Sequence, residues 1–145
     1  MMRFFFYGTL LDRDVMALVI GRRLSPAAYR PAWLAGHVRR RVKGASYPIV
    51  LRDPRAEVAG MVVGGLSGRD VARLAAYEGP GYRIAPLKVR LGGRLTTVAV
   101  FEPVQHRFQP TDGDWILTAW QWRYKRAFVD RLRRAFSAHP AYSRQ

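Results

Sequence analysis

The 145-residue sequence contains no cysteine, no asparagine and only three lysines. The absence of cysteine excludes disulfide bonds, thiolate nucleophiles and thiolate metal ligands, and it fits a reducing compartment such as the cytoplasm. No apolar run reaches the roughly 18–20 residues that a membrane-spanning helix needs. The N-terminal apolar run ends at Asp12, which makes it too short for the core of a signal peptide. We therefore expect a cytoplasmic protein without a membrane span.

Acidic residues are scarce as well, and the ten present are outnumbered by 25 lysines and arginines, for a formal net charge of +15 at pH 7. Such a charge attracts nucleic acids, anionic surfaces and acidic ligands. The arginines are nevertheless spread over the whole chain, and no known nucleic-acid-binding motif accompanies the short clusters Arg39–Arg41 and Arg131–Arg134. A GC-rich genome favours arginine codons and explains the same composition. Nucleic acid is thus the less favoured partner, and the sequence does not indicate an oligomeric state.

The apolar fraction of 49% and the length predict one folded domain over residues 1–145. Apolar or alternating runs predict strands over 2–7, 33–42 (with Gly36 as a bulge), 47–51, 57–66, 82–91 and 95–101. Prolines beside the third run suggest an edge strand. Gly92-Gly93 predicts a two-residue hairpin turn between the last two runs. Few helices accompany these strands, so we expect an α+β fold with a small mixed β-barrel.

Three helices are predicted from their start and stop signals. Asp12 can cap a short helix that ends at Gly21, and Ser67-Gly68-Arg69-Asp70 has the form of a capping box for a helix that ends at Gly79. Apolar residues then recur every four positions from Ile116 to Phe136, which predicts one long amphipathic C-terminal helix capped by Thr111 or Asp114.

Several classes of enzyme lack support. His37, His106 and His139 are far apart and do not have metal-ligand spacing, so we expect no metal and no cofactor, and we expect these histidines to be structural or exposed. No Gly-x-Ser-x-Gly, Walker or Gly-x-Gly-x-x-Gly motif follows a predicted strand. Serine hydrolases, P-loop enzymes and dinucleotide-dependent dehydrogenases are therefore unsupported.

Glu78 differs from the other two glutamates, Glu57 and Glu102, which lie at the ends of predicted strands and are expected to be solvated. It lies at the C-terminal end of a predicted helix, before a Gly79-Pro80-Gly81 corner. The helix dipole and burial would both raise its pKa towards the range of a general acid-base catalyst. The alternative is a solvated residue of the last helical turn, and composition alone favours that alternative.

The stretch Tyr7-Gly8-Thr9-Leu10 follows the aromatic strand Phe4-Phe5-Phe6 and precedes the first helix. Backbone N–H groups at such a turn can bind a carboxylate or another anion. Taken alone, such a stretch is more often a plain connection between a strand and a helix.

Together these motifs resemble the gamma-glutamylcyclotransferase-like superfamily, in its AIG2-like and gamma-glutamylamine cyclotransferase branch. The resemblance extends to about Trp122, and its motifs occur in the family's order. They are Tyr7-Gly8-Thr9-Leu10, Leu34-Ala35-Gly36-His37-Val38-Arg39, Tyr47-Pro48, Val58-Ala59-Gly60, Leu74-Ala75-Ala76-Tyr77-Glu78-Gly79, Tyr82-Arg83 and Trp115 after Asp-Gly-Asp.

The resemblance implies a small barrel whose cavity binds the gamma-glutamyl group of a small molecule. The catalytic acid-base residue would be Glu78, and the residues that bind the substrate would be Tyr7, Gly8, Thr9, Leu10, Tyr47 and Tyr82. The implied chemistry is an attack of the substrate's own α-amine on its γ-amide carbonyl, which releases 5-oxoproline and an amine without a metal or cofactor. The basic segment 123–145 lies outside the resemblance and is predicted to be a helical C-terminal extension, most simply a packing element.

Three positions depart from the family pattern. Thr9-Leu10 replaces the Ser-Asn-Leu of the branches that degrade glutathione and dipeptides, Ala75-Ala76 replaces a commonly acidic neighbourhood, and Phe101 replaces a frequent tyrosine. These departures leave the leaving amine open. They also keep two alternatives in view, a non-catalytic ligand-binding protein on the same fold and, less favoured, an anion-binding or nucleic-acid-binding protein.

Overall fold

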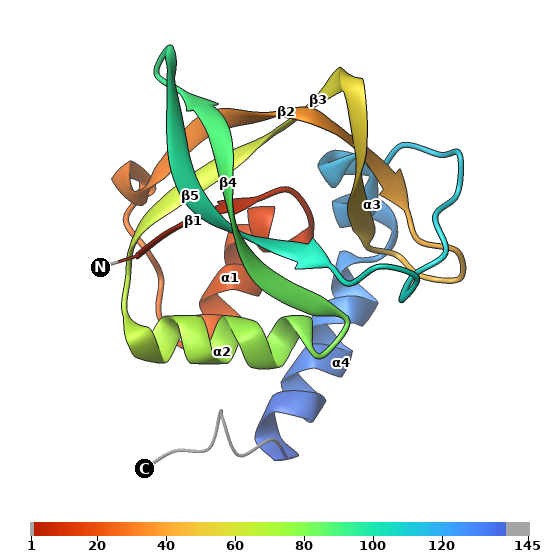
Figure 1. Ribbon diagram of the computed structural model, residues 1–145. Helices are drawn as coiled ribbons and strands as arrows, with labels where there is room; N and C mark the ends of the chain where they lie inside the picture. The colour runs from red at the N-terminus through yellow and green to blue at the C-terminus, as the bar shows by residue number, and fades with distance from the viewer. Residues whose placement is uncertain (1, 139–145) are drawn as a thin grey trace.

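The computed structural model describes residues 2–138, and five strands within that range form a closed barrel (Figure 1). The strands are β1 (Met2–Phe6), β2 (Tyr29–Arg41), β3 (Pro48–Leu66), β4 (Tyr82–Leu91) and β5 (Arg94–Pro103). Their order is β1-β3-β2-β4-β5; the ring closes with β1 parallel to β5, and the other neighbours are antiparallel. The prediction of an α+β fold with a small mixed barrel is confirmed.

Strand β1 lies between β3 and β5, and both of its faces are covered. Phe4 and Phe6 belong to a core that the barrel shares with the helices, whereas Phe5 belongs to a second core built from strand residues and Tyr7. This double burial explains why the strand has no alternation of polar and apolar residues. It also holds the chain rigidly up to the turn that follows.

The two predicted helix caps at Asp12 and Ser67 are confirmed. Asp12 precedes α1 (Arg13–Ile20) and accepts hydrogen bonds from the N–H groups of Asp14 and Val15. Ser67 and Asp70 form the reciprocal capping box of α2 (Gly68–Glu78). Two short 3-10 helices, η1 (Thr9–Leu11) and η2 (Pro26–Ala28), complete this part of the chain. Helices α1, α2 and α4 gather on one side of the barrel (Figure 1).

The third predicted strand does not end where the sequence suggests. The runs 47–51 and 57–66 belong to one continuous strand, β3. Residues 48–52 pair with β2 alone, whereas residues 61–66 also pair with β1, so the first part of β3 is an edge, as predicted. Pro54 is tolerated because the pairing with β2 is interrupted between Arg52 and Glu57, beside the predicted bulge at Gly36, where φ is 74°. No ladder hydrogen bond has to be donated at that point.

The single long C-terminal helix is replaced by two helices, α3 (Leu117–Arg123) and α4 (Lys125–Ala138). Tyr124 separates them with non-helical angles, φ −121° and ψ −23°. The predicted caps are wrong too, because Asp114 accepts from the N–H of Trp115 and Thr111 from the N–H of Gly113, while α3 begins after Ile116. The predicted extension 123–145 continues beyond the described residues, since 139–145 lie outside them.

Candidate active site

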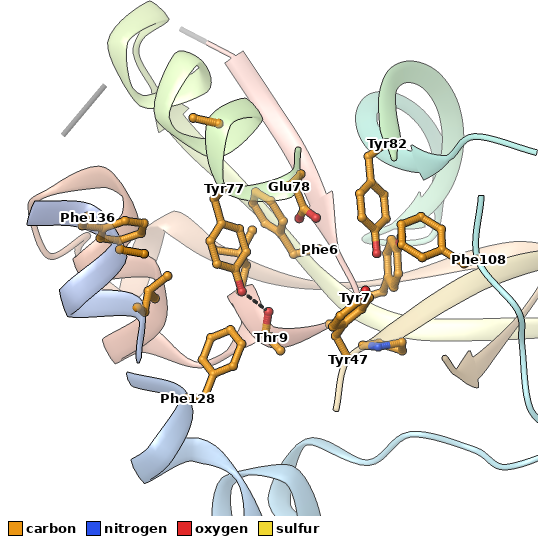
Figure 2. Close-up of a pocket in the computed structure, with 16 residues that line it drawn as sticks. Phe6, Tyr7, Thr9, Tyr47, Tyr77, Glu78, Tyr82, Phe108, Phe128 and Phe136 are labelled. Atoms are coloured by element: carbon orange, nitrogen blue, oxygen red, sulfur yellow. Dashed lines mark hydrogen bonds between the residues drawn. The ribbon is translucent and has the colours of Figure 1, made fainter. Parts of the chain in front are cut away.

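A pocket of about 400 Å³ opens where the turn after β1, the C-terminal end of α2, the start of β4 and one face of α4 meet (Figure 2). These segments are distant in the sequence and are brought together by closure of the barrel. All seven residues that the sequence predicted for the site line this pocket: Tyr7, Gly8, Thr9, Leu10, Tyr47, Glu78 and Tyr82. The geometry thus collects them in one place.

The turn Tyr7–Leu10 is held from three sides. Arg39 donates a hydrogen bond to the carbonyl oxygen of Tyr7 at 3.1 Å. The Thr9 hydroxyl lies 2.5 Å from the Tyr77 hydroxyl at the end of α2. Gly8 packs against the ring of Pro48, where a Cβ atom would lie only 3.2 Å from two ring carbons. The backbone of the turn is therefore fixed in position before any ligand binds.

Glu78 is the last residue of α2, and the next residue, Gly79, turns the chain sharply away with φ 78° and ψ −175°. Its carboxylate lies between Tyr77 and Tyr82 in Figure 2. Within residues 2–138, no side chain forms an ion pair or a hydrogen bond with this carboxylate. Burial raises the pKa of Glu78 to about 8. At neutral pH the group is therefore mostly protonated and ready to exchange a proton with a ligand.

Aromatic side chains line the pocket beyond Glu78. The Tyr7 hydroxyl donates a hydrogen bond to the carbonyl oxygen of Phe101 at 2.9 Å. Phe108 packs against Tyr82 and Tyr47, with ring centroids 5.0 and 6.0 Å apart. Burial, and to a smaller extent the neighbouring Glu78, raises the pKa of both Tyr7 and Tyr82. These phenols stay neutral at physiological pH and can serve only as hydrogen-bonding groups.

The sequence did not identify Phe108 or the contribution of α4, whose residues Phe128, Leu132, Ala135 and Phe136 also line the pocket. The period of four residues indicated an apolar face but not what that face covers. Tyr77 was noted only as a neighbour of Glu78, and nothing in the sequence indicated its bond to Thr9. Phe101 does not line the pocket. Its ring stacks on the ring of Phe4, with the centroids 5.1 Å apart.

The remaining candidate residues lie elsewhere. His37 is buried within β2, with its Nδ1 atom 3.0 Å from the carbonyl oxygen of Ala35. Glu57 pairs with Arg90 at the surface as expected, but Glu102 pairs with Arg83 and its side chain is only 13% exposed, so its predicted solvation is wrong. Among residues 2–138, no three His, Asp or Glu side chains are grouped so as to hold a metal ion.

No helix in the described part of the chain is long and apolar enough to cross a membrane.

Comparison with known proteins agrees with this geometry. Residues 4–123 match the family model described as gamma-glutamyl cyclotransferase, AIG2-like. Protein AIG2 C of Arabidopsis thaliana is 26% identical over 132 residues, which cover 90% of this chain and 78% of that protein. AIG2-like protein A of the same plant is also 26% identical, with the same coverage of both chains.

Solved structures share the fold. The solution structure of an Arabidopsis thaliana protein superposes with a TM-score of 0.67 at 24% identity, covering 96% of this chain and 85% of that one. A structure described as a gamma-glutamyl cyclotransferase gives a TM-score of 0.58 at 15% identity, covering 91% and 86%. The family model spans the barrel, the turn after β1, Glu78 and α3. The chain therefore belongs to the gamma-glutamyl cyclotransferase, AIG2-like family.

Proposed function

We propose that the protein is a gamma-glutamylamine cyclotransferase that releases 5-oxoproline and a free amine. The observation that carries this proposal is the position of Glu78. It is the one acidic or basic side chain among the described residues that line the pocket, it has a pKa of about 8, and it lines the same pocket as the fixed turn Tyr7–Leu10. A carboxyl group whose pKa lies near the working pH is suited to accept a proton and then return it.

In the proposed reaction the substrate's α-nitrogen bonds to its own γ-carbonyl carbon, and the bond from that carbon to the leaving nitrogen breaks. The Glu78 carboxylate takes a proton from the α-ammonium group, which makes the nitrogen nucleophilic. Protons lost by the α-nitrogen, two in all, pass to the leaving nitrogen. The products are the lactam 5-oxoproline and an ammonium ion, so no water, metal or oxidant is consumed.

The other pocket residues would act by positioning. Folding the substrate so that its amine meets its carbonyl supplies most of what an intramolecular reaction needs. Backbone N–H groups of the turn at Gly8–Leu10 would bind the α-carboxylate or the developing oxyanion, and the hydroxyls of Tyr47 and Tyr82 would donate to the same oxygens. The hydrogen bond from Tyr7 to Phe101 keeps that wall in place.

The ammonium group of the substrate would also activate Glu78. A positive charge within about 4–6 Å of a carboxyl group lowers its pKa. Binding would therefore convert the neutral acid of the free enzyme into the carboxylate that the first step requires. The cost of burying this acid without a partner would be offset only when a cationic ligand is present.

The test is a screen of gamma-glutamyl amides of varied amines, with 5-oxoproline detected by mass spectrometry. We expect turnover by the wild-type protein and a loss of about 10²-fold or more for Glu78→Gln. Glu57→Gln is the matched control, because it makes the same change at an exposed glutamate outside the pocket. Absence of 5-oxoproline from every amide, or full activity of Glu78→Gln, contradicts the proposal.

A further inference from the structure

We infer that the amine released by this enzyme is uncharged apart from its reacting nitrogen, an alkyl or arylalkyl amine that packs against α4. This inference rests on the proposed cyclotransferase function and adds the class of leaving group to it. It comes from the part of the pocket that lies outside the family match, since that match ends at residue 123 and α4 begins at Lys125.

The face of α4 that lines the pocket carries only hydrocarbon side chains. Phe128, Leu132, Ala135 and Phe136 recur at spacings of three and four residues and so share one side of the helix. The helix is otherwise strongly basic, yet none of its arginines lines the pocket. In a chain of net charge +15, the described residues thus give the pocket an uncharged wall.

The wall is fixed to the rest of the fold at its N-terminal end. Lys125 forms ion pairs with Asp12 at 2.9 Å and Asp14 at 2.6 Å, and Gln121 donates to Asp12 at 2.8 Å. Phe128 packs edge-on against Trp120 with ring centroids 5.2 Å apart. These contacts join α4 to the start of α1, so the apolar face belongs to the site before a ligand arrives.

The pocket has two unlike halves on either side of Glu78. Figure 2 shows Tyr7, Tyr47, Tyr82 and Phe108 on one side, and Phe128 and Phe136 on the other. The polar glutamyl head, with its ammonium and carboxylate groups, fits the half that carries the phenols. Because Glu78 must reach both the attacking and the leaving nitrogen, the rest of the substrate extends towards α4.

A charged leaving group would be poorly matched to that second half. Among the described residues the polar side-chain atoms there are the hydroxyls of Thr9 and Tyr77, which already bond to each other at 2.5 Å. The additional carboxylate and ammonium of a lysine leaving group would lose water without gaining an opposite charge, which is costly. A hydrocarbon chain of the same length would instead gain contact with the two phenylalanine rings and Leu132.

The experiment compares two substrates of equal reach, gamma-glutamyl-n-pentylamide and ε-(gamma-glutamyl)lysine, which differ in the charged groups at the end of the chain. We expect kcat/KM for the pentylamide to exceed that for the lysine compound by about 10²-fold or more. In a series from ethyl to pentyl, kcat/KM should rise about threefold for each added methylene.

Ala135→Lys tests the wall directly. Ala135 is exposed and lines the pocket, so the variant should fold while placing a cation beside the leaving group. The preference for the pentylamide should fall about tenfold or more. Ala127→Lys is the matched control, because it adds the same charge at an exposed alanine of α4 that does not line the pocket, and it should leave the preference unchanged.

Each outcome decides one proposal or both. Equal kcat/KM for the two substrates, or a preference that Ala135→Lys does not change, overturns the inference while the cyclotransferase function stands. If neither these two compounds nor any other amide of the screen is converted, the function fails, and calorimetry of Glu78→Gln with both compounds decides whether the pocket prefers the uncharged chain. Binding of the pentylamide alone supports the apolar wall, whereas binding of both or of neither overturns it.

Discussion

Two kinds of carboxylate withdrawn from solvent occur in this fold, the buried Asp12 and Asp70 and the partly buried Glu78, and they lie at opposite ends of helices. Asp12 and Asp70 lie at helix N-termini, where they accept hydrogen bonds from backbone N–H groups. They also form ion pairs, Asp12 with Lys125 and Asp70 with Arg22. Glu78 lies at the C-terminal end of α2 and has no such partner among the described residues. Capping and pairing make the first two stabilising. Burial without compensation makes Glu78 costly, which is typical of a functional group.

Helix α2 carries both kinds, eight residues apart. Burial alone would raise the pKa of Asp70, but its hydrogen bonds with Arg22 and Ser67 outweigh burial and hold that pKa below its usual value. Burial acts without opposition on Glu78 and raises its pKa. The comparison teaches that burial by itself does not mark the reactive acid. What distinguishes it is the absence of a built-in partner next to an open pocket.

The largest expected effect is on the pH dependence of activity. Only the carboxylate form of Glu78 can take a proton, so kcat/KM of the wild-type protein should rise about tenfold per pH unit below a pKa of about 8. Rates of 5-oxoproline formation between pH 5.5 and 8.5 give this profile. A flat profile over that range would mean that Glu78 does not act as the base.

The second effect concerns the pH dependence of stability and has the opposite sign to that expected for Asp70. The folded pKa of Glu78 lies above the unfolded value, so the free energy of unfolding should fall as pH rises from about 4.5 to 8. Glu78→Gln removes this titration and should be more stable than wild type at pH 9, by on the order of 3 kcal/mol. Urea unfolding at pH 5 and pH 9 measures the difference. Equal pH dependence in the two proteins would contradict it.

The third effect should be a loss of about 2 kcal/mol for Asp70→Ala at pH 7, because the variant lacks the capping box and the ion pair with Arg22. The pKa of Asp70 is lowered on folding, so this contribution is present above the unfolded pKa and is lost as pH falls through the folded value. The difference in free energy of unfolding between Asp70→Ala and the wild-type protein should therefore become smaller in acid. Chemical unfolding at pH 7 and pH 3 tests this, and a gap that widens in acid argues against it.

Much of the fold could be predicted because its signals are local. The aromatic run of β1, the cap at Asp12, the capping box at Ser67 and the Gly92-Gly93 turn each fix a conformation through neighbouring residues. The errors came from tertiary context. The runs 47–51 and 57–66 join into one strand because the pairing with β2 resumes beyond Pro54, and Tyr124 interrupts a helix whose apolar period continues across it.

The sequence predicted which motifs belong to the candidate site, but not how they and their neighbours are arranged in space. Tyr7–Leu10 and Glu78 were named from motifs, and the structure places them around one pocket. The wall from α4 could not be predicted, because a period of four residues shows that a face is apolar without showing which surface it covers. The bond between Thr9 and Tyr77 likewise joins residues 68 positions apart, a separation that no local pattern reports.

The smallest expected effect comes from that bond, which joins the fixed turn to the end of α2, where the unpaired acid of the comparison, Glu78, lies. Tyr77→Phe removes the hydroxyl that lies 2.5 Å from Thr9 but keeps the ring that packs against Phe128. We expect a loss of about 1 kcal/mol in the free energy of unfolding. If the bond also holds Glu78 in register with the turn, kcat should fall about tenfold while KM changes little. Thr9→Val removes the other partner of this bond. The double variant should therefore lose no more free energy of unfolding than either single variant. Additive losses would show that the two hydroxyls act separately.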